Sequence, residues 1–581
     1  MAVRLIPCEK TRPTIFARGS AHRHPNPNLA RALAHRVRNH GVQSYPPGPR
    51  KNVCSDSSCM TTHRLAIMTA IFLTSALLAA AQTTPAPRLS LPHTADGKPN
   101  FEGIWQASST AAADLQDHAA RLNMLAGRSV VVGGEIPYLP SAALTKAANF
   151  QNRQKADPLA QCFMPGVPRA MYLDFPFQIF QTPQTIAMAF EWSLDYRLIY
   201  TDGSAHPDAD TTFWMGDSRG RWDGDTLVVD VANNNDKTWF DMAGDFHSDA
   251  LHVVERYRMT GPDTIEYEAT IDDSKVFTKP WTIRLALHRR TDRDRLFEYV
   301  CQAELEETNG AFPREERTWY PGSGTPPPMA TTSAAPHAST PTTAAANIHR
   351  KPDGKPDFQG FYVPDAGGAN FGLERHANTG LTPGGRGLII DPPDLKLPME
   401  PWAVQERTDR QREERGYDDP TAHCFPAGVP RSMYVPTSYH ILQTADYVLI
   451  LHERVAWRII SLKERPHLPD SMRLWQGDSV GHWEGDTLVV DTTNLNGKTW
   501  LNEVGEVISY AAHVVERFTP GGPDTINYQA TVTDPVVYTR PWTIALPIRR
   551  EKGTMFESAC HEEDHDLPHL KAIKDRAAKT K

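Results

Sequence analysis

The sequence predicts a mainly β protein built as two tandem antiparallel up-and-down barrels, each with a short N-terminal helix. Three observations predict this fold: a long internal repeat, short segments that alternate between apolar and polar residues, and turn signals between those segments. Each copy has roughly eight to ten such segments with one apolar face, and closing them into a barrel avoids exposed sheet edges.

The repeat covers most of the 581 residues. The matching blocks are 96–101 with 353–358, 166–169 with 428–431, 216–230 with 477–491, and 252–256 with 513–517. The last two pairs share an offset of 261 residues, so two copies of one module follow each other in register. The expected parts are a spurious N-terminal extension at 1–59, a signal peptide at 60–81, a first module at 93–319, a Pro/Thr/Ala linker at 320–349, a second module at 350–572 and a basic tail at 573–581.

Residues 60–81 have the composition of a secretory signal peptide, with basic Arg64, an apolar run over 65–80 and three alanines before Gln82. The segment before it is rich in Arg, His and Pro, which indicates a misplaced start with Met60 as the true one; a transit peptide is the alternative. The sequence therefore predicts a periplasmic or secreted protein with no integral membrane segment after signal cleavage.

The charge of the mature chain argues against a nucleic-acid partner. The full chain has a net charge of −8, and residues 1–81 hold 11 Lys+Arg and 2 Asp+Glu, so the remainder carries −17. Binding to nucleic acid requires a basic surface that neutralises phosphates, and we expect no such partner. The sequence does not indicate an oligomeric state.

A helix is expected before the main strand region of each copy, at 141–154 and at 401–415. The strands expected in the first copy are 177–181, 185–192, 196–200, 211–215, 226–231, 251–257, 265–271, 281–287 and 296–301. A turn at Gly261, Pro262 and Asp263 joins two of these strands into a hairpin.

Four cysteines remain after the predicted cleavage, Cys162 and Cys301 in the first copy and Cys424 and Cys560 in the second. Four cysteines allow three pairings. The duplication favours Cys162–Cys301 and Cys424–Cys560, because each module then closes on itself, and an oxidising compartment would form both bonds. Neither copy has a second cysteine at zinc-ligand spacing, so we expect no metal centre.

Two features of the modules resemble known proteins. Gly103 and Trp105 are similar to the Gly-x-Trp that opens the first strand of lipocalin-like barrels, and the second copy has Gly360 and Tyr362 at that place. The repeated blocks, bounded by the two cysteines of each copy, resemble a large family of exported bacterial proteins that is known only as uncharacterised. The resemblance implies a lipocalin-like barrel in each copy and no particular activity.

Glu255 and Glu516 are the candidate catalytic residues. By alternation each shares a strand face with apolar and aromatic neighbours. A carboxylate on an apolar inner face has a raised pKa or a cationic partner, and either state suits acid–base chemistry or ligand anchoring. Arg169 and Arg431 are candidate partners, and a purely structural buried ion pair is the alternative.

Aromatic residues on the same faces suit the wall of an apolar pocket. The expected ligand-binding residues are Arg169, Tyr257, Tyr267 and Trp281 in the first copy, and Arg431, Phe518, Tyr528 and Trp542 in the second.

Other motifs are better explained by a structural role than by catalysis or metal binding. Ser218 and Ser479 follow Gly-Asp as in trypsin-like proteases, and His423 lies in a segment like their histidine segment. The first copy lacks that histidine, and 56 residues between His423 and Ser479 are too few for that architecture, so we interpret these segments as polar turns. His252 and His513 lie on the opposite strand face from the glutamates, which excludes a metal pair with them.

Two functions from different classes remain. The first is an exported binding protein that holds a small apolar or amphipathic ligand in a lipocalin-like barrel, with a glutamate or an arginine as polar anchor. The second is an acid–base enzyme of hydrolase, isomerase or cyclase type that uses Glu255 and Glu516 in the same pocket. Neither copy has a cofactor fingerprint, and we expect no cofactor.

Overall fold

The computed structural model describes residues 91–121, 124–311, 347–379, 382–454, 456–563 and 566–580, which fall within a single compact unit of the chain. The expected N-terminal extension, the signal peptide and most of the linker lie outside these residues. Among the described helices, none combines the length and the apolar character that a membrane span requires.

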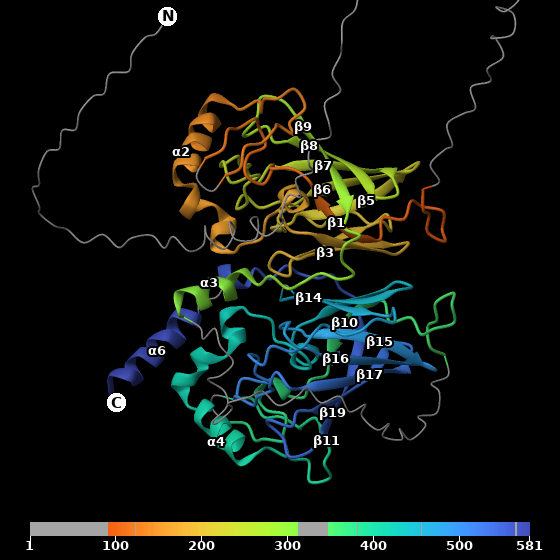
Figure 1. Cartoon of the computed structure of the whole chain (residues 1–581), viewed down its shortest axis with the longest axis vertical. Coiled ribbons are helices and arrows are strands. Elements are labelled where there is room, and N and C mark those ends of the chain that lie inside the picture. Colours follow the sequence, from red (N-terminus) through yellow and green to blue (C-terminus); the bar gives the residue numbers. More distant parts are fainter. Residues whose placement is uncertain are drawn as a thin grey trace, which may run out of the picture. The chain divides into compact units, whose positions relative to one another are not determined.

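The first module is a closed barrel of nine strands (Figure 1). In chain order these are β1 (Gly103–Ala107), β2 (Phe177–Gln181), β3 (Thr185–Phe190), β4 (Tyr196–Tyr200), β5 (Asp217–Asp223), β6 (Thr226–Ala232), β7 (His252–Gly261), β8 (Thr264–Asp272) and β9 (Trp281–Arg289). Consecutive strands pair, and β1 pairs with both β2 and β9, which closes the barrel.

The second module repeats this barrel. Its strands are β10 (Gly360–Pro364), β11 (Ile389–Asp391), β12 (Tyr439–Gln443), β13 (Tyr447–His452), β14 (Ala456–Ser461), β15 (Asp478–Glu484), β16 (Thr487–Thr493), β17 (His513–Gly522), β18 (Thr525–Thr533) and β19 (Trp542–Glu551). β10 pairs with β12 and β19 and so closes nine strands, while the short β11 is an additional strand on β19. The predicted fold, two tandem β barrels, is confirmed.

One strand pair in each barrel departs from the expected antiparallel order. β4 pairs with β5 in parallel, and β14 pairs with β15 in the same way. Parallel neighbours require the chain to cross from one end of the barrel to the other. The segment predicted as a strand at 211–215 belongs to this crossover and makes only an isolated bridge from Phe213 to Asn234.

The predicted helices exist but differ in position and length. α2 (Pro140–Ala156) and α4 (Pro401–Arg410) each begin with proline, which suits the first helical position. Both lie after the first strand of their barrel, and α4 ends five residues earlier than predicted because a 3₁₀ turn follows at Glu413–Asp418.

Each barrel is followed by a helix that the sequence analysis did not predict. These are α3 (Cys301–Asn309) in the first module, and α5 (Cys560–Glu563) and α6 (Asp566–Thr580) in the second. α6 contains most of the expected basic tail, and its Lys574 forms an ion pair of 2.6 Å with Asp418.

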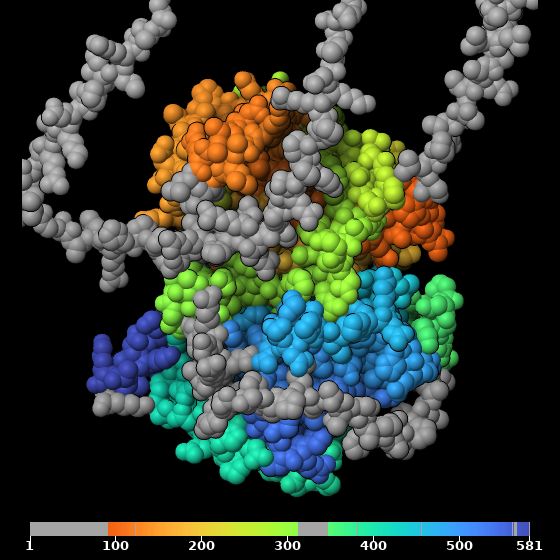
Figure 2. Space-filling model, viewed as in Figure 1, coloured from red at the N-terminus to blue at the C-terminus, as the bar shows by residue number. Residues whose placement is uncertain are grey.

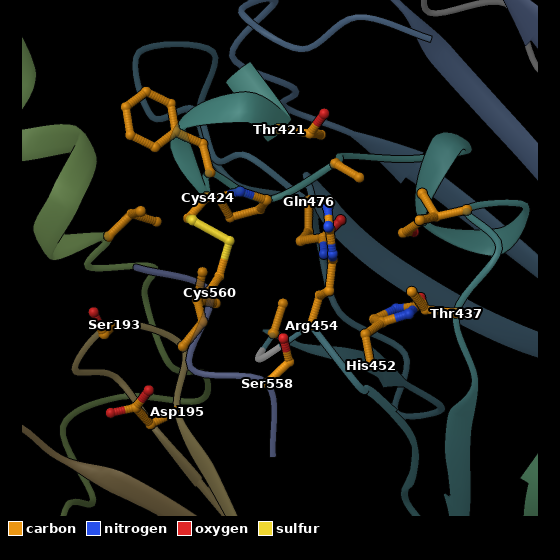
Figure 3. A pocket seen from close by; sticks show the side chains of 18 of the residues that line it. Ser193, Asp195, Thr421, Cys424, Thr437, His452, Arg454, Gln476, Ser558 and Cys560 are labelled. Atoms are coloured by element: carbon orange, nitrogen blue, oxygen red, sulfur yellow. A yellow bond between two sulfur atoms is a disulfide. The ribbon is translucent and has the colours of Figure 1, made fainter. Parts of the chain in front are cut away.

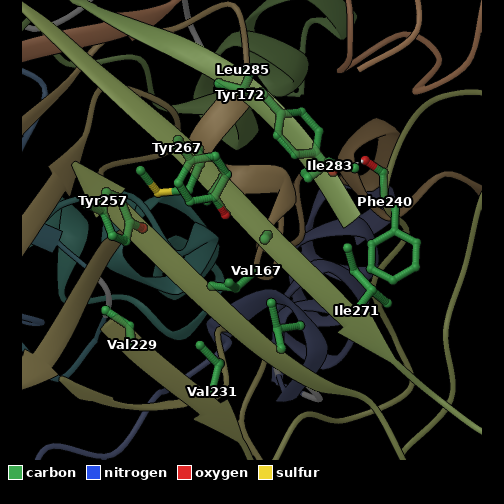
Figure 4. Packing of buried hydrophobic residues seen from close by; sticks show 14 of the residues in the cluster. Val167, Tyr172, Val229, Val231, Phe240, Tyr257, Tyr267, Ile271, Ile283 and Leu285 are labelled. Atoms are coloured by element: carbon green, nitrogen blue, oxygen red, sulfur yellow. Dashed lines mark hydrogen bonds between the residues drawn. The ribbon is translucent and has the colours of Figure 1, made fainter. Parts of the chain in front are cut away.

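The interiors of the barrels are filled by side chains that alternate inward. In β7 and β8 every second residue is buried, and Tyr257, Tyr267 and Ile271 are 0% exposed. Figure 4 shows side chains from β6 to β9 converging in the first barrel. Because burying one such side chain stabilises a fold by about 1.5–3 kcal/mol, this alternation accounts for the stability of the barrel.

The segment after each barrel contacts the other module. We call residues 290–311 the first arm and residues 552–563 the second arm. One half-buried glutamate in each arm accepts two backbone hydrogen bonds through its carboxylate. Glu298 accepts from Trp475 and from Gln476 (3.0 Å), and Glu557 accepts from Trp214 (2.6 Å) and from Met215 (3.0 Å). In Figure 2 the yellow-green first arm lies against the cyan and blue surface of the second module.

The two predicted disulfides, Cys162–Cys301 and Cys424–Cys560, are present. Cys301 and Cys560 belong to the arms, so each bond fixes an arm to its own module beside the contact that the arm makes with the other module.

Candidate functional site

The predicted inner-face glutamates are buried ion pairs. Glu255 is 0% exposed and binds Arg197 of β4 through both carboxylate oxygens. Its Oε1 also accepts hydrogen bonds from the hydroxyls of Tyr257 (2.9 Å) and Tyr267 (2.8 Å). Burial and the charge of Glu255 raise the pKa of both tyrosines well above the usual range, so both hydroxyls remain donors.

The second barrel repeats this network with two differences, one of which is that Thr492 donates to Glu516 (3.4 Å) where the first barrel has Val231. Glu516 binds Arg458 and accepts a hydrogen bond of 2.8 Å from Tyr528, while Phe518 takes the place of a second tyrosine. The inward orientation predicted for both glutamates is confirmed, but the predicted partners Arg169 and Arg431 are wrong. Alternation along one strand does not reveal which residue from across the barrel supplies the cation.

Arg169 and Arg431 form separate buried pairs. Arg169 donates to both oxygens of Asp157 at 2.7 Å, and Arg431 donates to both oxygens of Asp419 at 2.8 and 2.9 Å. Each aspartate precedes a 3₁₀ turn and accepts a backbone hydrogen bond from it, so the pairs hold the segments beside Cys162 and Cys424.

The remaining predicted ligand-binding residues belong to the barrel cores. Trp281 packs edge-on against Phe240 and Phe277, with ring centroids 5.7 and 5.3 Å apart. Trp542 packs in the same way against Tyr538 at 5.2 Å. Of the predicted ligand-binding residues, only Arg431 lines the cavity described next, and a ligand contact for the others stays a prediction.

A cavity lies between the two modules (Figure 3). It has about 1060 Å³ of empty space, counting the part that is open to solvent. The first module contributes Phe163, Met164 and the β3–β4 turn with Asp195. The second module contributes a larger share, including the Cys424–Cys560 disulfide, so both arms and both barrels shape the site.

The equivalent region of the first module is filled by aromatic rings. Phe175, Trp192 and Tyr299 pack on one another with ring centroids 4.9–5.3 Å apart. The second module has Thr437, Arg454 and Ser558 at the matching positions. The first two match at the offset of 262 that relates Cys162 to Cys424, and the third at the offset of 259 that relates Cys301 to Cys560. All three line the cavity, so the exchange of three rings for smaller or polar side chains leaves this space open.

Four buried polar atoms of residues that line the cavity have no hydrogen-bond partner among the described residues. They are Asp195 Oδ2, Ser432 Oγ, His452 Nε2 and Gln476 Oε1, in side chains that are 2–5% exposed. The first-module residues that match the last three are Ala170, Phe190 and Met215, which are apolar. Because an unpaired buried polar group costs about 1–3 kcal/mol, each of these atoms needs a partner that the described residues do not supply.

Burial favours the uncharged form of two of these groups. It raises the pKa of Asp195 well above the usual carboxyl range, with a further contribution from the charge of Glu557. Burial, together with the charge of Arg458, lowers the pKa of His452 to about 3. The cavity therefore has a carboxyl group from one module whose protonated form burial favours, and a neutral imidazole from the other.

The second module also has a hydrogen-bonded chain of an arginine, an asparagine and a glutamate in the cavity wall, and the first module lacks it. Arg431 Nε donates to Asn370 Oδ1 (3.2 Å), and Asn370 Nδ2 donates to Glu503 (2.6 Å). Burial raises the pKa of Glu503, and the charges of Arg431 and Arg454 oppose that shift. In the first module Ala112 and Met242 occupy the matching backbone positions, and the Nε of Arg169 has no partner among the described residues.

One group of carboxylates in the described residues has metal-ligand geometry. Oxygen atoms of Asp114, Asp241 and Asp245 lie within 4.8 Å of one another, and Lys146 is 3.6 Å from Asp245. These aspartates do not line the cavity.

Apart from Arg431 and the disulfide cysteines Cys162, Cys424 and Cys560, the cavity residues were missed by sequence reasoning. Inner-face alternation directs attention to the barrel cores, whereas Asp195 and Arg454 belong to turns between strands. A signal was nevertheless present, because the positions of Phe175, Trp192 and Phe190 are polar in the second copy when the repeats are aligned.

No protein-family model and no curated protein matches this chain. Among solved structures it is similar to the crystal structure of a protein of unknown function from the DUF3598 family of Nostoc punctiforme. The identity is 7%, the match covers 66% of this chain and 91% of that chain, and the TM-score is 0.13. A TM-score this low carries no argument about function.

Proposed function

We propose that this chain is an exported binding protein that holds a small amphipathic molecule in the cavity between its modules. The observation that carries the proposal is the set of four unpartnered buried polar atoms on one cavity, from Asp195, Ser432, His452 and Gln476. Phe163, Met164, Phe425 and Pro426 add apolar wall, and this combination of apolar lining with a few polar groups is typical of small-molecule sites.

The proposed site differs from the barrel interior that the sequence favoured. Glu255 and Glu516 have their charge matched by Arg197 and Arg458 and accept tyrosine hydroxyls, which favours a structural role over acid–base chemistry. Export is supported by the two disulfides, because such bonds persist in oxidising compartments.

The test fills the cavity with the side chains of the first module. In the variant Thr437→Phe, Arg454→Trp, Ser558→Tyr we expect fluorescence enhancement of the dye N-phenyl-1-naphthylamine to fall at least tenfold. Native mass spectrometry of the wild-type chain should also show a co-purified small molecule that the filled variant lacks.

A matched control carries the same kinds of change at exposed positions of the first module, Thr278→Phe, Arg128→Trp and Ser141→Tyr. The control should bind the dye like the wild-type chain. The proposal fails if the filled variant, folded by circular dichroism, keeps the dye signal and the mass of the wild-type chain.

A further inference from the structure

Resting on the proposed function, we infer that the ligand is an uncharged ring compound that presents hydroxyl or N–H donors to the cavity. The unpartnered atoms define what such a ligand must offer. Gln476 Oε1 can only accept a hydrogen bond, so it requires a donor from the ligand. Ser432 and His452 can each donate or accept, which suits a hydroxyl group.

The charges around the cavity favour a neutral ligand. Arg431 is already paired with both oxygens of Asp419. Glu503 is close enough to Arg431 and Arg454 that their positive charges oppose the rise of its pKa. No excess charge of either sign is left in the described cavity wall to balance a carboxylate or an ammonium group, and burying an unbalanced charge is costly.

The apolar residues of the cavity wall favour a ligand with a planar ring. Phe163, Met164, Phe425 and Pro426 line the same space, and Phe425 packs on Trp475 at 5.2 Å. Aromatic and thioether side chains pack well on planar rings. A ring with a hydroxyl group therefore satisfies both halves of the site.

The experiment compares three probes that share one bicyclic ring: 2-naphthol, naphthalene and 2-naphthoate. They are titrated at neutral pH into the full chain, where the first carries a neutral donor, the second no polar group and the third a negative charge. We expect 2-naphthol to bind about tenfold more tightly than naphthalene, because its hydroxyl pairs a buried acceptor. We expect 2-naphthoate to bind more weakly than 2-naphthol.

Two variants test whether Gln476 and Ser432 cause the preference for 2-naphthol over naphthalene. Gln476→Met and Ser432→Ala introduce the first-module residues, and each should reduce the preference for 2-naphthol over naphthalene several-fold while leaving naphthalene affinity unchanged. Tightest binding of 2-naphthoate, equal or better binding of naphthalene, or no binding of 2-naphthol overturns this inference. None of these results affects the proposed function, which depends on whether filling the cavity abolishes dye binding.

Discussion

The two modules share their barrel but differ where they face the cavity. Both keep nine closing strands, a disulfide, a buried Arg–Glu pair and an arm that contacts the other module. The first module fills the region beside its disulfide with Phe175, Trp192 and Tyr299, whereas the second has Thr437, Arg454 and Ser558 there. Several of the positions that differ between the two copies surround one cavity, which indicates that this region of the second module has a role beyond folding.

Loss of a disulfide should have the largest effect on either module. Cys162 and Cys301 are 139 residues apart, and Cys424 and Cys560 are 136 apart, so the entropic model gives about 5 kcal/mol for each bond. We expect the serine double variant of either pair to lower the free energy of unfolding by that amount in urea titrations. Both cysteines of the Cys424–Cys560 bond line the cavity, whereas Cys162 alone of the first bond does, so loss of the second bond should weaken dye binding more. Equal dye binding in both variants would contradict the assignment of the site to the second module.

The buried ion pairs provide the next comparison. Glu255→Ala and Glu516→Ala each leave a buried arginine without its counter-ion, which should destabilise the chain by about 3–5 kcal/mol. The loss should be larger for Glu255→Ala by less than about 1 kcal/mol, because two tyrosine hydroxyls at 2.9 and 2.8 Å lose their acceptor there, whereas Tyr528 (2.8 Å) and the more distant Thr492 hydroxyl (3.4 Å) lose theirs in the second barrel. Urea unfolding of the two variants side by side measures the difference, and a cost below 1 kcal/mol in either would argue against a structural role.

The two arms should respond differently to pH. Burial raises the pKa of Glu298 to about 8 and that of Glu557 to about 7, above the value that an unfolded chain gives. The native state therefore holds these protons more tightly, and its stability falls as pH rises from about 5, by about 1 kcal/mol per pH unit for each group. Glu298→Gln should remove the part of this slope that extends to about pH 8, and Glu557→Gln the part that ends near pH 7. An unchanged slope in both variants would exclude the arms as its source.

The smallest expected change in stability comes from altering the hydrogen-bond partner of the Nε atom in Arg431 or in Arg169. Asn370→Ala should cost about 1–2 kcal/mol, since Arg431 Nε and Glu503 each lose a hydrogen bond. The reverse change, Ala112→Asn, should stabilise the first module by about 1 kcal/mol by giving Arg169 Nε a partner. Thermal unfolding of both variants is the measurement, and a destabilising Ala112→Asn would mean that the two environments are not equivalent.

Much of the fold follows from local sequence patterns. The period-two pattern of β7 and β8 depends only on neighbouring residues, and so does the turn between them. The disulfide pairing followed from the duplication. The parallel β4–β5 pair could not be predicted, because nothing in either strand specifies the direction of its neighbour.

Much less of the candidate site could be predicted from local sequence patterns. Alternation correctly oriented Glu255 inward but assigned it the wrong cation, since Arg197 lies 58 positions earlier in the chain. Asp195 and His452 lie in different modules, and only the packing of one module against the other brings them to one cavity.

The sequence by itself determined that this protein is a duplicated, disulfide-linked β barrel, because alternation, turns and repeats are encoded over short distances or by direct identity between copies. The tertiary structure decided where a ligand has room. A cavity is defined by which side chains are absent from a packed volume, and that depends on residues from both modules and both arms at once.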